Sequence, residues 1–276
     1  MPRIDSHQHF WNYSAEQYPW ISDAMSILRC DHLPADLRAE QTPLDFAGSV
    51  AVQARQTVDE SRWLLELAAG DDVVKGVVGW VDLRSDSLSA ELDELAPQAK
   101  FVGVRHVVQD EPDDNFVLRP KFMRGIGALA ARGLTYDLLT FPKQLPASIA
   151  LVKAFPDQPF VLDHISKPLI ADGTISPWDA QIRELAACEN VMCKVSGMVT
   201  EAKWDDWTTA TFAPYLDVVF EAFGPERIMI GSDWPVCRVA GNYQDSMNVV
   251  IDYIAQASAD EQDAILGGNA IRFYGL

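Results

Sequence analysis

Short runs of apolar residues alternate with longer stretches of helical periodicity along the whole chain. The short runs are almost continuously hydrophobic, which is typical of strands buried on both faces of a parallel sheet. The longer stretches repeat apolar residues three and four positions apart, which predicts amphipathic helices. The predicted strands are Arg3–His9, Gly48–Gln53, Val74–Val81, Phe101–Val107, Thr135–Leu139, Pro159–Asp163, Val191–Val195 and Arg227–Gly231.

The alternation of strands and helices predicts the α/β class and, within it, a (β/α)8 TIM barrel, regular or distorted. The length of 276 residues suits one such barrel. Since no linker or shift in composition divides the chain, we expect a single domain over residues 1–276. The predicted helices are residues 61–70, Ser87–Ala96, Lys121–Arg132, Pro146–Ala154, Asp179–Ala187, Thr208–Phe223 and Tyr243–Ala257.

The longest predicted connection, Phe10–Pro43, follows the first strand and is rich in aromatic residues. Loops above the carboxyl ends of barrel strands commonly form lids or pocket walls. Trp20 is therefore a candidate to pack on the apolar face of a ligand. The alternative is that Trp11, Tyr18 and Trp20 anchor the connection to the barrel.

The composition restricts the partners and the compartment. The net charge is −18, from 40 acidic and 22 basic residues, which disfavours nucleic acids and anionic membranes. No apolar run is long enough to span a bilayer, and the charged start of the chain does not resemble a secretory signal. Whether copies of the chain form a homo-oligomer stays open. Reduced thiols of a cytoplasmic protein are expected at Cys30, Cys188, Cys193 and Cys237, which lack zinc-type spacing.

The first strand carries two histidines, His7 and His9. Residues two apart on a strand face the same side, so both imidazoles point to one place. Such a pair binds a divalent metal or polarises an oxygen atom. Four of the five histidines fall at predicted strand ends, where the catalytic groups of TIM barrels lie. His32 is the exception, and we expect it to be structural or part of the lid.

Other polar residues follow the same rule. Alternation sends only one of Arg105 and His106 into the pocket, and a guanidinium suits substrate oxygens, which favours Arg105. Of the pair after strand six, His164 is the expected reactive group and Asp163 a brace. Lys194 lies within an apolar run, where a charge without a role is costly. The remaining strand ends place Gln53, Arg55, Trp80, Asp82, Tyr136, Asp137 and Asp233 at the same end of the barrel.

Taken together, these motifs resemble the amidohydrolase superfamily, and within it the branch of sugar lactonases. The similarity covers nearly the whole chain, and L-fuconolactonase-like members look closest. The matching segments are Ile4–Trp11, Tyr18–Trp20, Val52–Arg55, Val78–Trp80, Leu162–His164, Lys194–Gly197, Val199–Ala202, Gly231–Pro235 and Gly267–Tyr274.

One departure from the superfamily concerns metals. Metal-rich members have a histidine after strand five, and binuclear members also have a bridging Lys or Glu on strand four. This chain has Tyr136 and Asp137 after strand five, and Arg105 and His106 on strand four. The resemblance therefore argues against a binuclear centre. It leaves either no required cofactor or a single divalent ion such as zinc, bound by His7, His9 and Asp233.

The resemblance implies hydrolysis of a small sugar-derived aldonolactone. Asp233 is then the expected general base, and His7, His9 and His164 stabilise the oxyanion. Two alternatives remain: a metal-dependent non-oxidative decarboxylase of the same superfamily, and a sugar-binding module without activity. Substrate-binding roles are expected for Arg105, Lys194, Gln53, Trp20 and Trp80.

Overall fold

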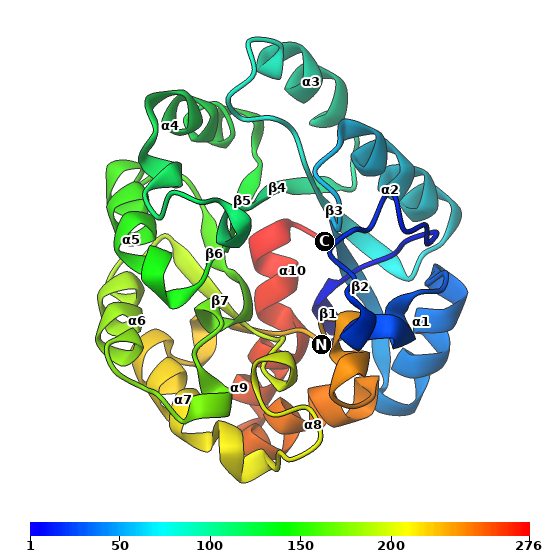
Figure 1. The fold of residues 1–276 in the computed structure, drawn as a ribbon, viewed down its shortest axis with the longest axis vertical. Helices are drawn as coiled ribbons and strands as arrows, with labels where there is room; N and C mark the ends of the chain where they lie inside the picture. The colour runs from blue at the N-terminus through cyan, green and yellow to red at the C-terminus, as the bar shows by residue number, and fades with distance from the viewer.

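The computed structural model describes residues 1–276 and confirms the TIM barrel. Eight parallel strands pair in sequence order, and most helices lie outside the ring that they form (Figure 1). The strands begin and end within two residues of the predicted positions. They are β1 (Arg3–Gln8), β2 (Phe46–Val52), β3 (Val74–Gly79), β4 (Phe101–Val107), β5 (Thr135–Leu139), β6 (Phe160–Leu162), β7 (Val191–Val195) and β8 (Ile228–Ile230).

The helices bury their apolar faces against the strands in one large hydrophobic core. Local sequence explains several helix starts: the Thr57 hydroxyl accepts from the Glu60 amide, and Asn242 accepts from the Asp245 amide. The helices are α1 (Pro34–Gln41), α2 (Val58–Gly70), α3 (Leu88–Leu95), α4 (Pro120–Ile126), α5 (Leu145–Ala154), α6 (Trp178–Ala186), α7 (Thr209–Phe223), α8 (Tyr243–Tyr253), α9 (Ala259–Asp263) and α10 (Asn269–Tyr274). None of them is both long and apolar enough to cross a membrane.

Two predictions about connections need correction. The segment Phe10–Pro43 is not one loop, because it contains the 3-10 helix Asp23–Leu28 and the whole of α1. The predicted helix Lys121–Arg132 ends at Ile126, and a separate 3-10 turn follows at Ala130–Arg132. The first prediction failed because α1 is polar on most of its surface and buries few residues, so its periodicity is weak.

The barrel is not sealed by strand pairing alone. The ladder runs from β1 to β8 and does not continue between β8 and β1. The segment after β8 closes this seam: the Asp233 amide donates to the His7 carbonyl at 2.9 Å. The buried Asp5 carboxylate accepts from the Ser232 amide at 2.9 Å and from its hydroxyl at 2.6 Å. The seam therefore holds the end of β1 beside Asp233.

The last helix, α10, lies in the centre of the ring rather than outside it (Figure 1). Ala270 and Tyr274 of this helix pack with inward-facing strand residues such as Val50 and Met229 in a second apolar cluster. No helix is predicted here from the sequence, although Gly267–Tyr274 is one of the segments that resemble the lactonase branch.

Candidate active site

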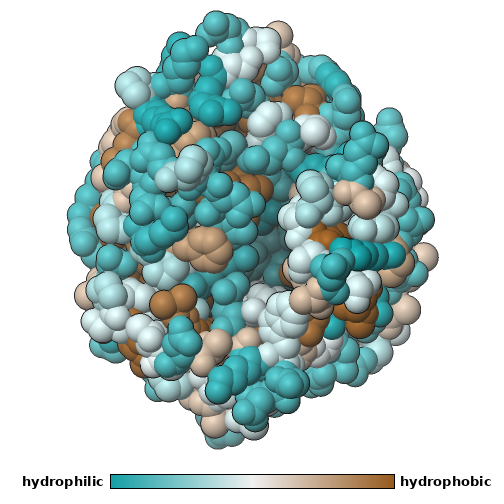
Figure 2. Space-filling view, viewed as in Figure 1, coloured by the Kyte–Doolittle hydropathy of each residue, from teal (hydrophilic) through white to brown (hydrophobic).

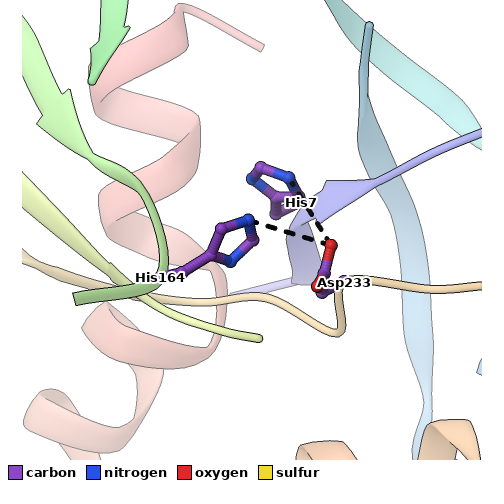
Figure 3. Close-up of side chains that lie close together, drawn as sticks. All are labelled: His7, His164 and Asp233. Atoms are coloured by element: carbon purple, nitrogen blue, oxygen red, sulfur yellow. Dashed lines mark ion pairs between the residues drawn. The ribbon is translucent and has the colours of Figure 1, made fainter. Parts of the chain in front are cut away.

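Four side chains converge at the carboxyl ends of the strands, and we call them the floor cluster: His7, His9, His164 and Asp233. The Nε2 atoms of His7 and His9 are 3.3 Å apart, so the predicted convergence of the pair is present. Asp233 Oδ1 lies 3.3 Å from His9 Nε2 and 3.9 Å from His7 Nε2. His164 Nε2 approaches the same oxygen to 3.8 Å, and its ring lies beside that of His7 (Figure 3).

Unusual backbone conformations bring the two later residues into this cluster. Asp233 and His164 both have left-handed dihedral angles, with φ of 57° and 52°. Each such non-glycine residue costs on the order of 1–3 kcal/mol, and strain of this kind concentrates at functional sites. Gly197 allows the close approach, because a Cβ there would lie 2.6 Å from His164 Nδ1. The neighbouring Ser196 hydroxyl lies 2.9 Å from the same nitrogen and orients the ring.

The floor cluster brings hydrogen-bond acceptors together. His9 Nδ1 lies 2.8 Å from the Val52 carbonyl, which only accepts, so this nitrogen carries hydrogen. In a neutral ring, His9 Nε2 then presents a lone pair to Asp233 Oδ1. Two acceptors at this distance require a proton or a metal ion between them. The geometry therefore suits a cluster that binds a proton or a cation.

Burial sets the charge of the other members. It lowers the pKa of His7 well below its usual value, and the Lys194 and Arg105 cations lower it further. Burial also lowers the pKa of His164 well below its usual value, although Asp233 opposes the shift. For Asp233 burial raises the pKa, but His164 and His9 outweigh it and hold the pKa below its usual value. Near neutral pH the cluster thus combines neutral His7 and His164 rings with an ionised carboxylate.

The residues present fit a single divalent ion. Ligand atoms of His7, His164 and Asp233 all lie within 4.8 Å of one another, and all three residues are buried. Two imidazoles and a carboxylate are a donor set that zinc accepts, and Asp163 Oδ1 stands 3.3 Å behind His7 Nδ1 as the outer partner that such ligands use. The group contains His164 where the sequence had suggested His9, which lies beside it.

A cavity of about 880 Å³ opens above the floor cluster and is large enough for a small organic molecule. Figure 2 shows a hollow near the middle of the face in view, with hydrophilic residues around it. Three predicted substrate-binding residues line the cavity: Trp20, Gln53 and Arg105. Trp11 and Tyr18, by contrast, are buried in a small apolar cluster that anchors the loop.

Two predicted substrate-binding residues do not line this cavity. Lys194 is fully buried and forms ion pairs with Asp137 and Asp163, which hold its ammonium inside the barrel. Trp80 turns its ring against His106, with Nε1 donating to Nδ1 at 3.2 Å. Of the two neighbours on β4, Arg105 lines the cavity, whereas His106 packs against Trp80 in the barrel wall. His32 is buried between Trp11 and Trp234, as a structural residue is.

Beneath the floor lie three fully buried charged residues, which we call the sealed layer: Asp137, Asp163 and Lys194. Lys194 Nζ contacts both carboxylates and lies 3.1 Å from Asp163 Oδ1. Arg105 Nη1 joins this layer to the floor, at 3.1 Å from Asp163 Oδ2 and 3.2 Å from His7 Nε2. The predicted role of Asp163 as a brace agrees with these contacts.

Sequence reasoning missed Lys167, which also lines the cavity. It ends a run of four left-handed residues, His164 to Lys167, and its Nζ lies 3.6 Å from Glu201 Oε1. The nearby His164-x-x-Lys167 spacing was visible in the sequence. A run of left-handed residues without glycine has no sequence pattern that announces it, so the direction of Lys167 was not predictable.

Known proteins resemble this chain over its full length. A family model described as "Amidohydrolase" matches residues 4–276. The chain is 42% identical to an L-fucono-1,5-lactonase of Burkholderia multivorans, covering 99% of this chain and 96% of that protein. It is 36% identical to an L-fucono-1,5-lactonase of Burkholderia ambifaria, with 99% and 95% covered.

Solved structures show the same similarity to amidohydrolases. The crystal structure of a Burkholderia multivorans amidohydrolase with bound zinc matches with a TM-score of 0.97 and 42% identity, and all of both chains is covered. A 2,6-dihydroxybenzoate decarboxylase from Rhizobium matches with a TM-score of 0.70 but only 14% identity, which indicates a shared fold alone. The family model and the full-length relatives lead to one conclusion: the chain belongs to the amidohydrolase family.

Proposed function

We propose that this protein hydrolyses an aldonolactone similar to L-fucono-1,5-lactone and releases the aldonic acid. The observation that carries the proposal is the full-length identity of 42% to a protein of that activity. The site supports it chemically, because an ionised, buried carboxylate stands among three imidazoles at the floor of a cavity. A lactone is a reactive ester, and its hydrolysis needs a base and oxyanion stabilisation.

In the proposed reaction Asp233 removes a proton from water as the water oxygen attacks the lactone carbonyl. The ring C–O bond then breaks, and the proton held by Asp233 passes to the departing ring oxygen, which gives the open-chain aldonic acid. The low pKa of Asp233 keeps it ionised near neutral pH, which is the form that a general base requires. The imidazoles of His7, His9 and His164 surround the carbonyl oxygen, and each stabilises the developing negative charge where its nitrogen carries a proton toward that oxygen or binds a cation there. A single divalent ion, bound by His7, His164 and Asp233, would polarise the carbonyl in the same place.

Cavity residues account for binding of the polyhydroxylated substrate. Gln53 and Arg105 present polar groups at the cavity wall, and Trp20 presents an apolar ring. Lys167 adds a cation on the side of His164. Its ammonium has three donors and one ion-pair partner at 3.6 Å, so donors remain for a substrate hydroxyl or the carboxylate of the product.

The proposal is tested with the purified protein and a panel of fucono-, galactono- and rhamnonolactones, assayed with and without a chelator. We expect turnover of at least one aldonolactone. Release of carbon dioxide from an aromatic acid, with no lactone turnover, would show a decarboxylase instead. Binding of lactones without turnover would identify a sugar-binding module. Activity that a chelator removes and zinc restores would assign a required metal.

A further inference from the structure

The C-terminal segment Gly267–Tyr274 resembles the lactonase branch in sequence, but none of its residues acts in the proposed reaction. The structure shows what holds it in the barrel. Gly267 passes against the first strand, where a Cβ would lie 2.2 Å from the Pro2 carbonyl oxygen. The Asn269 amide donates to the carbonyls of Pro225 and Ile228, both at 2.7 Å. These contacts dock α10 at the amino ends of β1 and β8.

From this position Tyr274 reaches into the barrel interior. Its hydroxyl lies 3.0 Å from Asp137 Oδ2 and 3.2 Å from Oδ1, and the bond is buried. Burial raises the pKa of Tyr274 well above its usual value, so the hydroxyl keeps its proton. Tyr274 is therefore a donor to Asp137, a residue of the sealed layer.

The sealed layer continues from Asp137 to the floor of the cavity. Asp137 pairs with Lys194, whose Nζ lies 3.3 Å from His7 Nδ1. Asp163 Oδ1 contacts both groups, at 3.1 Å from Lys194 Nζ and 3.3 Å from His7 Nδ1. An unbroken series of buried polar contacts thus joins the C-terminal helix to a histidine of the floor cluster.

Charge balance gives the Tyr274 hydroxyl a specific effect. Lys194 is drawn toward Asp137 on one side and toward Asp163 on the other. The Tyr274 hydroxyl satisfies part of the hydrogen-bonding capacity of the Asp137 carboxylate. Without it, Asp137 loses a buried donor, and the balance of the contacts that Lys194 makes with Asp137, Asp163 and His7 changes.

We propose that Tyr274 is a positioning residue, which fixes the orientation of the His7 ring through Asp137 and Lys194. The kinetic part of this inference rests on the proposed lactonase function. Removing a direct outer partner of a ligating histidine typically changes affinity or activity by about 10- to 100-fold, and Tyr274 lies two contacts further back, so the lower end of that range is expected.

The test compares Tyr274→Phe with Tyr136→Phe. The first variant removes only the hydroxyl, since the ring that lies 5.4 Å from Lys194 Nζ remains. Tyr136 is the matched control: it is fully buried, precedes Asp137 and donates to no carboxylate. We expect Tyr274→Phe to lower kcat on the lactone about tenfold with KM within about twofold, and Tyr136→Phe to leave both unchanged.

A second readout is independent of activity. The nitrogen NMR resonances of the His7 ring should shift in Tyr274→Phe and stay in place in Tyr136→Phe. A second variant, Asp137→Asn, should shift them further and lower kcat more. A Tyr274→Phe protein that melts earlier but keeps its kcat and its His7 resonances would overturn the inference. A wild-type protein without lactone turnover, together with shifted resonances, would refute the proposed function alone.

Discussion

The floor cluster and the sealed layer are built from similar residues on adjacent levels of one barrel, yet they differ in charge balance. In the sealed layer each carboxylate has a cationic partner, with Asp163 held between Lys194 and Arg105 at 3.1 Å. In the floor cluster Asp233 faces only imidazoles, at 3.3 to 3.9 Å.

This difference in charge balance separates the residues expected to react, in the floor cluster, from those that hold their geometry, in the sealed layer. Buried charges that are fully paired hold their geometry and resist a change of protonation. A buried carboxylate among imidazoles, without a Lys or Arg partner at ion-pair distance, instead remains free to take a proton or a cation. The two groups also differ in their access to the cavity. His9, His164 and Asp233 line it, whereas the residues of the sealed layer do not. The comparison leads to three predictions.

The largest effect is expected from Asp233→Asn in the floor cluster. The amide keeps the shape of the side chain but does not accept a proton from water. We expect kcat on the preferred lactone to fall about a thousandfold, with a circular-dichroism spectrum like that of the wild type. A variant that keeps kcat within tenfold would assign the base to another residue.

A matched pair of lysine variants tests the sealed layer. Lys194→Met leaves Asp137 and Asp163 without their shared cation, and breaking a buried ion pair in this way costs about 3–5 kcal/mol. Lys167→Met removes a cavity cation whose single ion pair is long, and we expect a loss of stability below about 1 kcal/mol.

Urea denaturation measures both stabilities, and lactone turnover measures both activities. We expect Lys167→Met to impair turnover although its fold is stable, and Lys194→Met to lose stability as well. Equal destabilisation by the two variants would contradict the division between the cavity and the sealed layer.

The smallest effect is expected at the cavity wall. Trp20→Ala removes an apolar surface beside the substrate and should raise KM about fivefold with little change in kcat. Trp204→Ala is the control, since both tryptophan residues are 37% exposed but Trp204 lies outside the cavity lining. Steady-state kinetics distinguish the two variants, and an unchanged KM for Trp20→Ala would exclude stacking on the substrate.

The strands were predictable because each is a short, continuously apolar run, and buried parallel strands leave that pattern in any sequence. The cluster of His7, His9, His164 and Asp233 followed from one further rule, that barrel strands carry functional groups at their carboxyl ends. The same rule misplaced Lys194, because alternation along a strand gives the side that a residue faces and not its depth in the barrel. It misplaced Trp80 because the preference of its indole for His106 depends on a neighbouring strand.

By itself, the sequence determined the barrel, the residues gathered at its carboxyl end and the kind of chemistry they support. These follow from local periodicity and residue type. Only the tertiary structure decided which residues reach the cavity and which balance charge beneath it. The deciding contacts join distant segments: Ser232 to Asp5 across 227 residues at the seam, and Tyr274 to Asp137 across 137 residues in the interior. Local patterns do not encode such contacts, because they arise only when the barrel closes and the last helix enters it.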